Sequence, residues 1–341
     1  MLSGFKRISH LLRRASHMPA KEILVANIPK ETDETAYLKA NPDVACAVDS
    51  GQFRSGLQHY ELFGKAEGRS WGEREGAAAP DADFHAAKAS KLKRIEPLLL
   101  EEMPCIKTVS LYDFLTEDMR NEFRIIDTDA VSSNNYDGHV LDLIDRHRDG
   151  LILDCGAGKR AVYYPNVVNF EIVAYESTDV RGVGEVLPFK ANSFDAVVSI
   201  AVLEHVKDPF RCAKEIERVL KPGGDLICCV PFLQPYHGYP HHYYNMTHQG
   251  LRNLFSDSIS VDRIDVYQSV LPIWSLTWIV QSWAAGLTGK TREDFLAMKM
   301  GDLLNPPTSF LQAPMVTELS SEKNHELASA NVLFGSKRPI E

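Results

Sequence analysis

From residue 151 onward, short apolar segments alternate with stretches whose apolar residues recur at helical spacing, such as 209–220. The apolar segments are 151–155, 167–173, 180–185, 194–200 and 225–231. This alternation is typical of strands joined by crossover helices, which build a mostly parallel sheet. We therefore predict an α/β fold with a mostly parallel seven-stranded sheet and flanking helices. The segments 259–268 and 328–338 are expected to supply its last two strands.

The first of these strands ends on Asp154-Cys155-Gly156-Ala157-Gly158. Glycines at the carboxyl end of a strand let the backbone turn sharply and let a ligand approach closely. Asp154 is placed to accept hydrogen bonds from the amides of the turn or from a cationic group of a ligand. The segment 156–161 also matches the G-x-G-x-x-G/A pattern of dinucleotide-binding folds. An acid suits a ligand that carries an ammonium and a sulfonium better than it suits a pyrophosphate.

This turn is the first of four segments that follow one another in the chain: D-C-G-A-G (154–158), L-P-F…S-F-D-A-V-V-S (187–199), A-V-L-E-H-V (201–206) and L-K-P-G-G (220–224). In this order they resemble the class I S-adenosylmethionine-dependent methyltransferases, in particular the type 11-like branch that acts on small molecules. The resemblance implies a Rossmann-like fold, S-adenosyl-L-methionine as the cofactor and methyl transfer as the reaction. A dehydrogenase has no reason to carry the last two segments, so an NAD-dependent oxidoreductase is the less favoured alternative.

The resemblance also implies which residues contact the cofactor. Glu171, at the end of the second strand, would accept hydrogen bonds from the ribose hydroxyls, with Glu176 as a substitute. The complete predicted cofactor set is Asp154, Cys155, Gly156, Gly158, Glu171, Glu185, Val186 and Ala201. Only about eight residues separate Gly158 from the second strand, fewer than a parallel crossover normally needs, so the first helix is expected to be vestigial.

The segment 231–255 interleaves histidines with tyrosines. An imidazole titrates near neutrality, so a histidine here can act as general base toward a hydroxylated acceptor. The candidate catalytic residues are His237, His241 and, beside the expected cofactor, His205. A metal site is a less favoured interpretation and none is predicted, because no acidic residue accompanies the histidines of this segment. An equal alternative is an ordered aromatic loop whose histidines bond backbone carbonyls.

The chain before this domain divides by composition. Residues 1–30 are basic and are predicted to form a flexible tail, with contact to a membrane surface as the less favoured interpretation. Residues 31–72 predict a small α-helical module, similar in its Y-L-x-x-N-P-D-V pattern to modules of bacterial glycan and polysaccharide assembly proteins. Residues 73–130 are predicted to be a linker and helical pre-domain. The methyltransferase domain is expected over 131–341, with a helical insert at 270–310.

The charge and the cysteine content limit which partners and which cellular compartment are expected. The formal net charge is −9, so the chain lacks the basic excess with which proteins grip nucleic acid. The six cysteines include no C-x-x-C pair, which indicates a reducing compartment and a cytoplasmic protein. The insert 270–310 carries Trp274, Trp278 and Trp283, which are expected to pack as a lid or as a homodimer contact.

Two classes of function remain at this point. The first is methyl transfer to a small hydroxylated molecule, such as a sugar in polysaccharide or glycan biosynthesis. The second is a catalytically idle scaffold or binding protein. The intact acid and glycines at 154–158 favour the enzyme.

Overall fold

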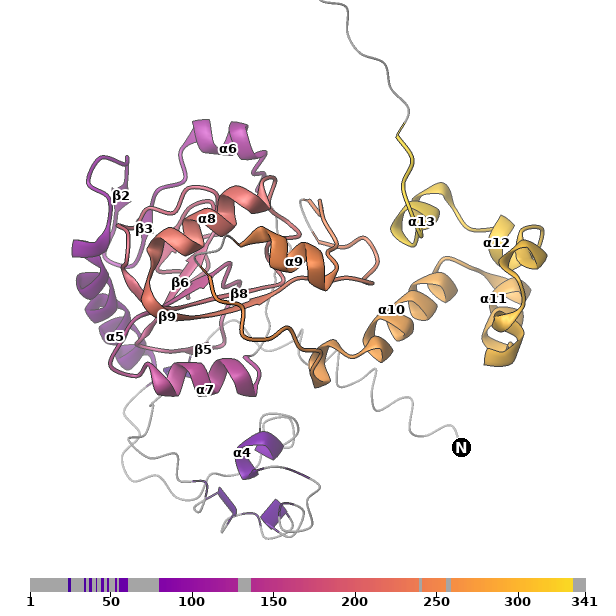
Figure 1. Cartoon of the computed structure of the whole chain (residues 1–341), viewed down its shortest axis with the longest axis horizontal. Coiled ribbons are helices and arrows are strands. Elements are labelled where there is room, and N and C mark those ends of the chain that lie inside the picture. The colour runs from indigo at the N-terminus through magenta and orange to yellow at the C-terminus, as the bar shows by residue number, and fades with distance from the viewer. Residues whose placement is uncertain are drawn as a thin grey trace, which may run out of the picture. The chain divides into compact units, whose positions relative to one another are not determined.

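The computed structural model describes residues 80–127, 136–238, 241–255 and 259–333, together with 24–25 and short pieces between 34 and 60. The chain divides into two compact units, whose elements are labelled in Figure 1. The first unit comprises Met1–Val202 and Asp208–Cys229. The second comprises Leu203–Lys207 and Val230–Glu341, so the predicted domain 131–341 contributes to both units.

The first unit is built on a seven-stranded sheet with the order β2-β3-β7-β6-β4-β8-β9. Its strands are β2 (Ile106–Lys107), β3 (Tyr112–Asp113), β4 (Ile152–Cys155), β6 (Val167–Glu171), β7 (Val180–Arg181), β8 (Phe194–Ile200) and β9 (Leu220–Cys229). Every neighbouring pair is parallel except β2 and β3. The predicted mostly parallel, seven-stranded α/β sheet is confirmed.

Two of the predicted strands are wrong. Residues 259–267 form no strand and lead into the 3-10 turn η3 (Gln268–Val270), and residues 328–333 form no strand either. Residues 334–338 lie outside the described part of the chain. The sheet instead includes β2 and β3, from the segment predicted to be a helical pre-domain. These strands have two residues each, too few to produce a detectable alternation of apolar and polar positions.

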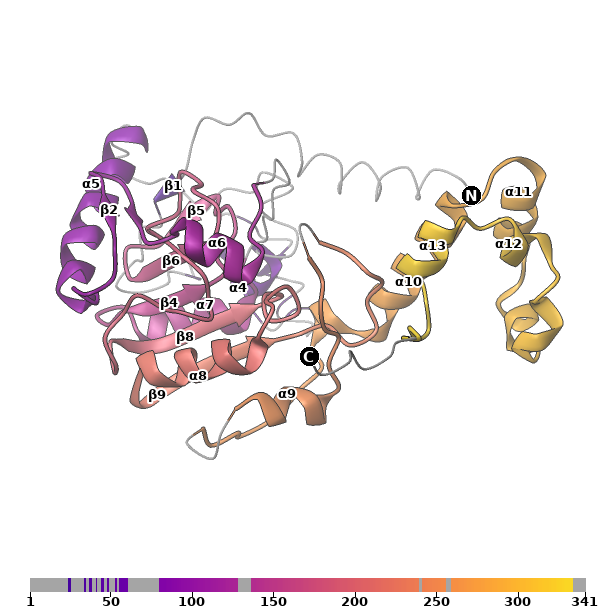
Figure 2. The same ribbon diagram turned by 90° about the horizontal axis from the view of Figure 1, so that it is seen from above.

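Two helices of the first unit illustrate how the sequence builds its layers. In α8 (Pro209–Val219), the Asp208 side chain caps the first turn by accepting the amide of Arg211 at 3.0 Å, as predicted. In α7 (Gly138–Arg146), Val140, Leu143 and Ile144 pack against the sheet. Figure 1 shows α7 and α8 on opposite faces of the sheet, and Figure 2 shows α8 running beside β8 and β9.

The connection from β4 to β6 contains no helix among its residues, all of which the structure describes. It holds only the short strand β5 (Val162–Tyr163), which pairs in parallel with β1 (Leu24–Val25). The expectation of a vestigial first helix is confirmed. Of the predicted tail 1–30, Leu24–Val25 is the part described, and it is a strand.

Helix α5 (Pro80–Ile95) brings a buried cation to this part of the sheet. The Lys91 ammonium is fully buried and lies 2.8 Å from Oδ2 of Asp179. It also donates to the carbonyl of Val167 and lies 3.5 Å from the centre of the Tyr163 ring. Desolvation lowers the pKa of Lys91 to about 8 although Asp179 opposes that shift. The pair therefore joins α5 to β5, β6 and the turn before β7.

The first unit also contains helix α6 (Glu117–Phe123). The Thr116 hydroxyl caps this helix by accepting the amide of Met119. Of the predicted helical module 31–72, the structure describes α4 (Gly56–His59) and isolated residues. Among these, Tyr37 and His59 are buried and hydrogen bonded at 3.0 Å between the Tyr37 hydroxyl and Nδ1 of His59. The assignment of this stretch to a glycan-associated module stays a prediction.

The second unit is helical. Its helices are α9 (His248–Leu254), α10 (Pro272–Ala285), α11 (Gly289–Ala297), α12 (Pro314–Thr317) and α13 (Ser321–Glu326), with 3-10 turns η4 (Met300–Leu304) and η5 (Pro307–Phe310). Trp283 packs on Phe295 and donates its indole N–H to the carbonyl of Met315, whereas Trp274 is 56% exposed. None of the described helices is long and apolar enough to cross a membrane. The lid or homodimer role of 270–310 stays a prediction.

We predict that Lys91→Ala lowers the free energy of unfolding by about 3–5 kcal/mol, because it leaves the Asp179 carboxylate buried without its cation. Chemical denaturation followed by circular dichroism measures this change. The control is Lys93→Ala, on the exposed side of the same helix, which should change stability by less than about 0.5 kcal/mol. Equal effects of the two substitutions would contradict the structural role of Lys91.

Candidate functional site

The order of the strands marks one place in the first unit where a ligand can bind. Strand β4 lies between β6 and β8, so the chain leaves β4 toward one side of the sheet and later returns to its other side at β8. In open parallel sheets, ligands bind at such a switch point, outside the carboxyl ends of the strands. Here the carboxyl ends of β4 and β8 are followed by Gly156 and Ala201.

Three residues at this edge adopt left-handed backbone angles: Gly156 with φ of 89°, Gly158 with φ of 62° and Ala201 with φ of 55°. A Cβ on Gly156 would lie 2.4 Å from Cγ2 of Val202, which follows β8. Gly156 is therefore required both for the turn and for the close approach of the chain after β8. Ala201 pays a conformational cost that a glycine would not, and such strain is common at ligand sites.

Asp154 does not contact the amides of the turn. Those of Gly156 and Ala157 donate to the carbonyl of Phe170, at 2.9 and 3.0 Å. The buried Asp154 carboxylate instead accepts from the Tyr136 hydroxyl and from the Arg160 guanidinium, whose NH2 group lies 2.6 Å from Oδ2. The negative charge of Asp154 is thus compensated within the chain.

Sequence reasoning missed Tyr136 and Arg160. Arg160 was visible as a cation two residues past the glycines, but its partner was not. The Arg160 guanidinium also stacks over the Tyr136 ring at 4.0 Å. Because Asp154→Ala would leave Arg160 buried without its anion, at a cost of about 3–5 kcal/mol, that substitution cannot isolate cofactor binding.

Glu171 joins the end of β6 to the glycine turn. Its Oε2 accepts the amide of Gly158 at 2.7 Å, and its Oε1 accepts the amide of Ile172 at 2.8 Å. Burial raises the pKa of Glu171, and these amide donors oppose the shift. A carboxylate has about four acceptor positions, so each oxygen keeps capacity for a hydroxyl of a ligand. Glu176 is exposed.

The other predicted cofactor residues lie at neighbouring points of the first unit. Cys155 is buried in the sheet, so only its backbone can face the turn. Glu185 is buried, and its Oε1 accepts the amide of Asp208 at 3.3 Å, at the start of α8. Val186 is half-buried beside it. Ala201 donates its amide to the carbonyl of Cys229 at 3.0 Å.

The predicted catalytic histidines all belong to the second unit. His205 and His237 lie with their ring centres 5.3 Å apart. Nδ1 of His205 bonds the carbonyl of His241 at 2.7 Å, and Nδ1 of His237 bonds the carbonyl of Pro235 at 2.8 Å. The ring of His241 lies beside Tyr243, with 5.2 Å between the ring centres. Burial lowers the pKa of His205 to about 4 and also lowers the pKa of His237, so both rings are neutral at neutral pH.

Sequence reasoning did not predict that Glu204, which precedes His205 in the chain, lies beside the histidines. Its side chain is fully buried, and burial raises its pKa to about 8. Its Oε1 lies 3.7 Å from Nε2 of His205. Because Glu204 is 33 residues before His237 in sequence, the histidine-rich segment gave no sign of an acid nearby.

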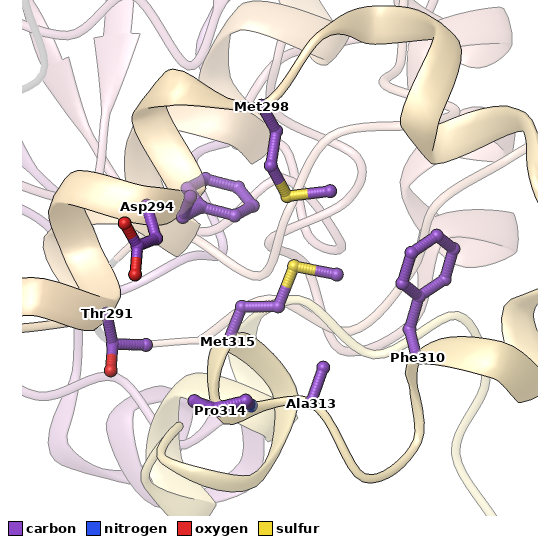
Figure 3. A pocket seen from close by; sticks show the side chains of 8 residues that line it. Thr291, Asp294, Met298, Phe310, Ala313, Pro314 and Met315 are labelled. Atoms are coloured by element: carbon purple, nitrogen blue, oxygen red, sulfur yellow. The ribbon is translucent and has the colours of Figure 1, made fainter.

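A separate pocket of about 230 Å³ lies among α11, η5 and α12 of the second unit. Figure 3 shows the Met298 and Met315 side chains turned toward one another inside it. Its apolar lining comes from Phe295, Met298, Phe310, Ala313, Pro314 and Met315. None of the predicted site residues lines it.

A protein-family match covers the part of the chain that contains the glycine turn. Residues 155–228 match the family described as a methyltransferase domain. An uncharacterized protein of Methanocaldococcus jannaschii is 33% identical over 102 residues, which are 27% of this chain and 45% of that protein. An uncharacterized methyltransferase of a Mycobacterium species (strain JLS) is 40% identical over 70 residues, 20% of this chain and 27% of its own length. The chain thus spans less than half the length of these curated relatives.

Solved structures match this chain only at low TM-scores. The YcgJ protein from Bacillus has a TM-score of 0.29 and 18% identity, covering 46% of this chain and 88% of its own. Phosphoethanolamine N-methyltransferase 2 of Haemonchus contortus, solved with S-adenosyl-L-methionine, has a TM-score of 0.29 and 17% identity, with 47% of each chain covered. The family match assigns a methyltransferase domain to residues 155–228, and S-adenosylmethionine is the cofactor of such a domain.

The residues at the switch point fit that cofactor. Two left-handed glycines leave the turn without side chains, and Glu171 offers a carboxylate to the two adjacent hydroxyls of a ribose. Because the Asp154 carboxylate is already paired with Arg160, Glu171 is the acid at the turn that is placed to accept hydrogen bonds from a ligand.

We predict that Gly156→Ala weakens S-adenosylmethionine binding by at least about tenfold, because the new Cβ meets Val202 and the left-handed angle is strained. Isothermal titration calorimetry measures the dissociation constant. The matched control is Gly223→Ala, which has a φ of 77° but no neighbour within 4 Å of the added Cβ. If Gly156→Ala bound the cofactor as tightly as the wild type, the glycine turn would not be part of the cofactor site.

We predict that Glu171→Gln weakens cofactor binding by about 10–100-fold, the range for losing a hydrogen bond to a charged acceptor. In the wild type, affinity should fall as the pH is lowered toward the raised pKa of Glu171, because protonation removes the acceptor. The glutamine variant should lose this pH dependence. Glu176→Gln serves as the control; an effect there and none at Glu171 would reverse the assignment.

Proposed function

We propose that this chain, which carries a class I S-adenosylmethionine-dependent methyltransferase domain, transfers the methyl group of that cofactor to a small hydroxylated acceptor of the sugar class. The observation that carries the proposal is the coincidence of the family match at 155–228 with the left-handed glycine turn at the switch point. The cofactor, when bound, supplies a methyl group on a sulfonium leaving group.

On the cofactor side, we assign each residue the role that its position supports. Gly156 and Gly158 let the backbone lie against the methionine and ribose parts. Glu171 accepts the ribose hydroxyls, and Glu185 with Val186 lies toward the adenine. Ala201 contributes its backbone, and Asp154 with Cys155 supports the turn from the strand.

On the acceptor side, the second unit offers rings that suit a sugar. Tyr236 is 55% exposed and stacks on the His242 ring, with 5.6 Å between centres and 20° between planes. The apolar faces of sugars stack on such rings. His237 and His241 are the acceptor-side histidines, and a neutral imidazole can accept the proton that a hydroxyl gives up on methylation. His205 holds the segment in place through its bond to the His241 carbonyl.

We further propose a role in polysaccharide or glycan biosynthesis in the cytoplasm. The resemblance of 31–72 to modules of glycan assembly proteins supports the first part. The reduced thiols of Cys105, Cys155 and Cys212 are compatible with a reducing compartment.

The direct test is incubation of the protein with methyl-labelled S-adenosylmethionine and sugars, nucleotide sugars or lipid-linked saccharides, followed by mass spectrometry of labelled products. A labelled hydroxyl on a saccharide supports the proposal. Cofactor binding with label appearing only on amines or on protein would assign a different acceptor. No cofactor binding would favour the idle scaffold.

We predict that His237→Ala and His241→Ala each lower turnover by about 10²–10⁴-fold, the usual contribution of acid–base catalysis, while the cofactor dissociation constant stays unchanged. Steady-state kinetics and calorimetry on the same preparations provide both values. The control is His248→Ala, an exposed histidine at the start of α9. Full turnover in both variants would end the proposal that this segment serves the acceptor.

A further inference from the structure

Three side chains of the second unit bring ligand atoms of the kind that bind metals together. One carboxylate oxygen of Glu204 and one ring nitrogen each of His205 and His237 all lie within 4.8 Å of one another. Among the residues that the structure describes, this is the group of three histidine, cysteine or acidic side chains whose ligand atoms come this close together. Two of the three follow β8, and the third comes from the loop after β9.

The Glu204 carboxylate lacks a hydrogen-bond partner. Both of its oxygens are buried, and neither accepts a hydrogen bond. The nearest polar group of the cluster, Nε2 of His205, is 3.7 Å away, which is too far for a hydrogen bond. A buried carboxylate without a partner is unfavourable, and native structures normally satisfy such a group with a donor, a water or an ion.

The two histidines are oriented as metal ligands usually are. A carbonyl can only accept, so Nδ1 of His205 and Nδ1 of His237 each carry the proton that bonds to the backbone. That tautomer leaves the lone pair on Nε2 of each ring. Metal-ligating histidines typically donate their second ring nitrogen to a carbonyl or carboxylate in this way.

His242 shows the contrast within the same loop. Its Nδ1 accepts the backbone amide of His237 at 3.0 Å, and its Nε2 bonds Oδ1 of Asn245 at 2.9 Å. Both of its ring nitrogens are therefore used, and it holds the backbone of His237 in place.

A glycine allows the loop to approach His205. Gly238 has a φ of 86°, and a Cβ on it would lie 2.4 Å from Cε1 of His205. Only a residue without a side chain lets the loop place His237 beside that ring. The close approach is thus built into the sequence, as expected for a site.

We propose that Glu204, His205 and His237 bind one divalent first-row transition metal ion, of the Zn²⁺ class. Imidazole and carboxylate together suit zinc and its neighbours better than Mg²⁺ or Ca²⁺, which prefer oxygen ligands. Around a tetrahedral zinc with bonds of about 2.1 Å, ligand atoms lie about 3.4 Å apart, so the side chains close by about an ångström on binding. Three protein ligands leave a fourth position for water or a hydroxyl oxygen.

The inference does not depend on methyl transfer, because metal binding is measured without cofactor or acceptor. It bears on the role of His237, since a nitrogen that holds a metal cannot also accept a proton. With the ion bound, His237 is a metal ligand, and a loss of turnover in His237→Ala is accompanied by a loss of the ion. A general base would not produce that second change.

The test is titration of the metal-free full chain with Zn²⁺, and with Co²⁺ as a spectroscopic probe. We expect one ion per chain in the wild type and in the control His248→Ala. Glu204→Gln and His237→Ala should each weaken binding by at least about 100-fold, more than is typical for loss of a group that only orients a metal ligand. Visible absorption of Co²⁺ should indicate nitrogen and oxygen ligands in the wild type and be lost in both variants.

Glu204→Gln keeps the size and shape of the side chain and introduces no charge, so it should fold about as well as the wild type without metal. Zinc should then raise the thermal midpoint of the wild type and of His248→Ala, but not of Glu204→Gln. His237→Gln provides a second ligand variant if the alanine variant is unstable. The proposal is overturned if the wild type binds no stoichiometric ion, or if Glu204→Gln binds zinc as tightly as the wild type.

Discussion

The structure of the first unit depends on one constraint: the parallel strands β4, β6 and β8 all end at the same edge of the sheet. Because β4 lies between the other two, the turns that follow the strands converge there. Gly156 makes this convergence sterically possible, since Val202 occupies the space that a Cβ would need. The hydrogen bond from Gly158 to Glu171 then fixes the turn to the end of β6. The proposed cofactor site follows from this packing.

Buried charges in the two units are handled differently. In the first unit, Asp154 is paired with Arg160 and Asp179 with Lys91, so each of these two buried carboxylates has a cation from another part of the chain. Such pairs contribute little net stability but are costly to break, which ties the segments together. In the second unit, Glu204 has no such cation, although two neutral histidines lie beside it. Asp154 and Asp179 therefore have structural roles, whereas the Glu204 carboxylate is available as a ligand for the proposed metal ion.

The sequence predicted an element correctly where the spacing of its apolar residues and the capping or turn residues at its ends indicated the same structure. The strands β4, β6 and β8, the helix α8 with its Asp208 cap, and the glycine turn could all be predicted from residues that are close in sequence. What could not be predicted depends on distant pairings. Arg160 as the partner of Asp154, and Glu204 beside His237, are set by the fold. The two-residue strands β2 and β3 have too little pattern, and the polar alternation of 259–268 resembled a strand that no sheet edge accommodates.

An experimental structure of the chain with S-adenosylhomocysteine, the product form of the cofactor, would show directly whether the glycine turn and Glu171 hold the nucleoside. We expect the nucleoside to lie against Gly156 and Gly158, with its ribose hydroxyls bonded to the Glu171 carboxylate. A ligand bound elsewhere in the chain, or a ribose that leaves Glu171 untouched, would contradict this expectation.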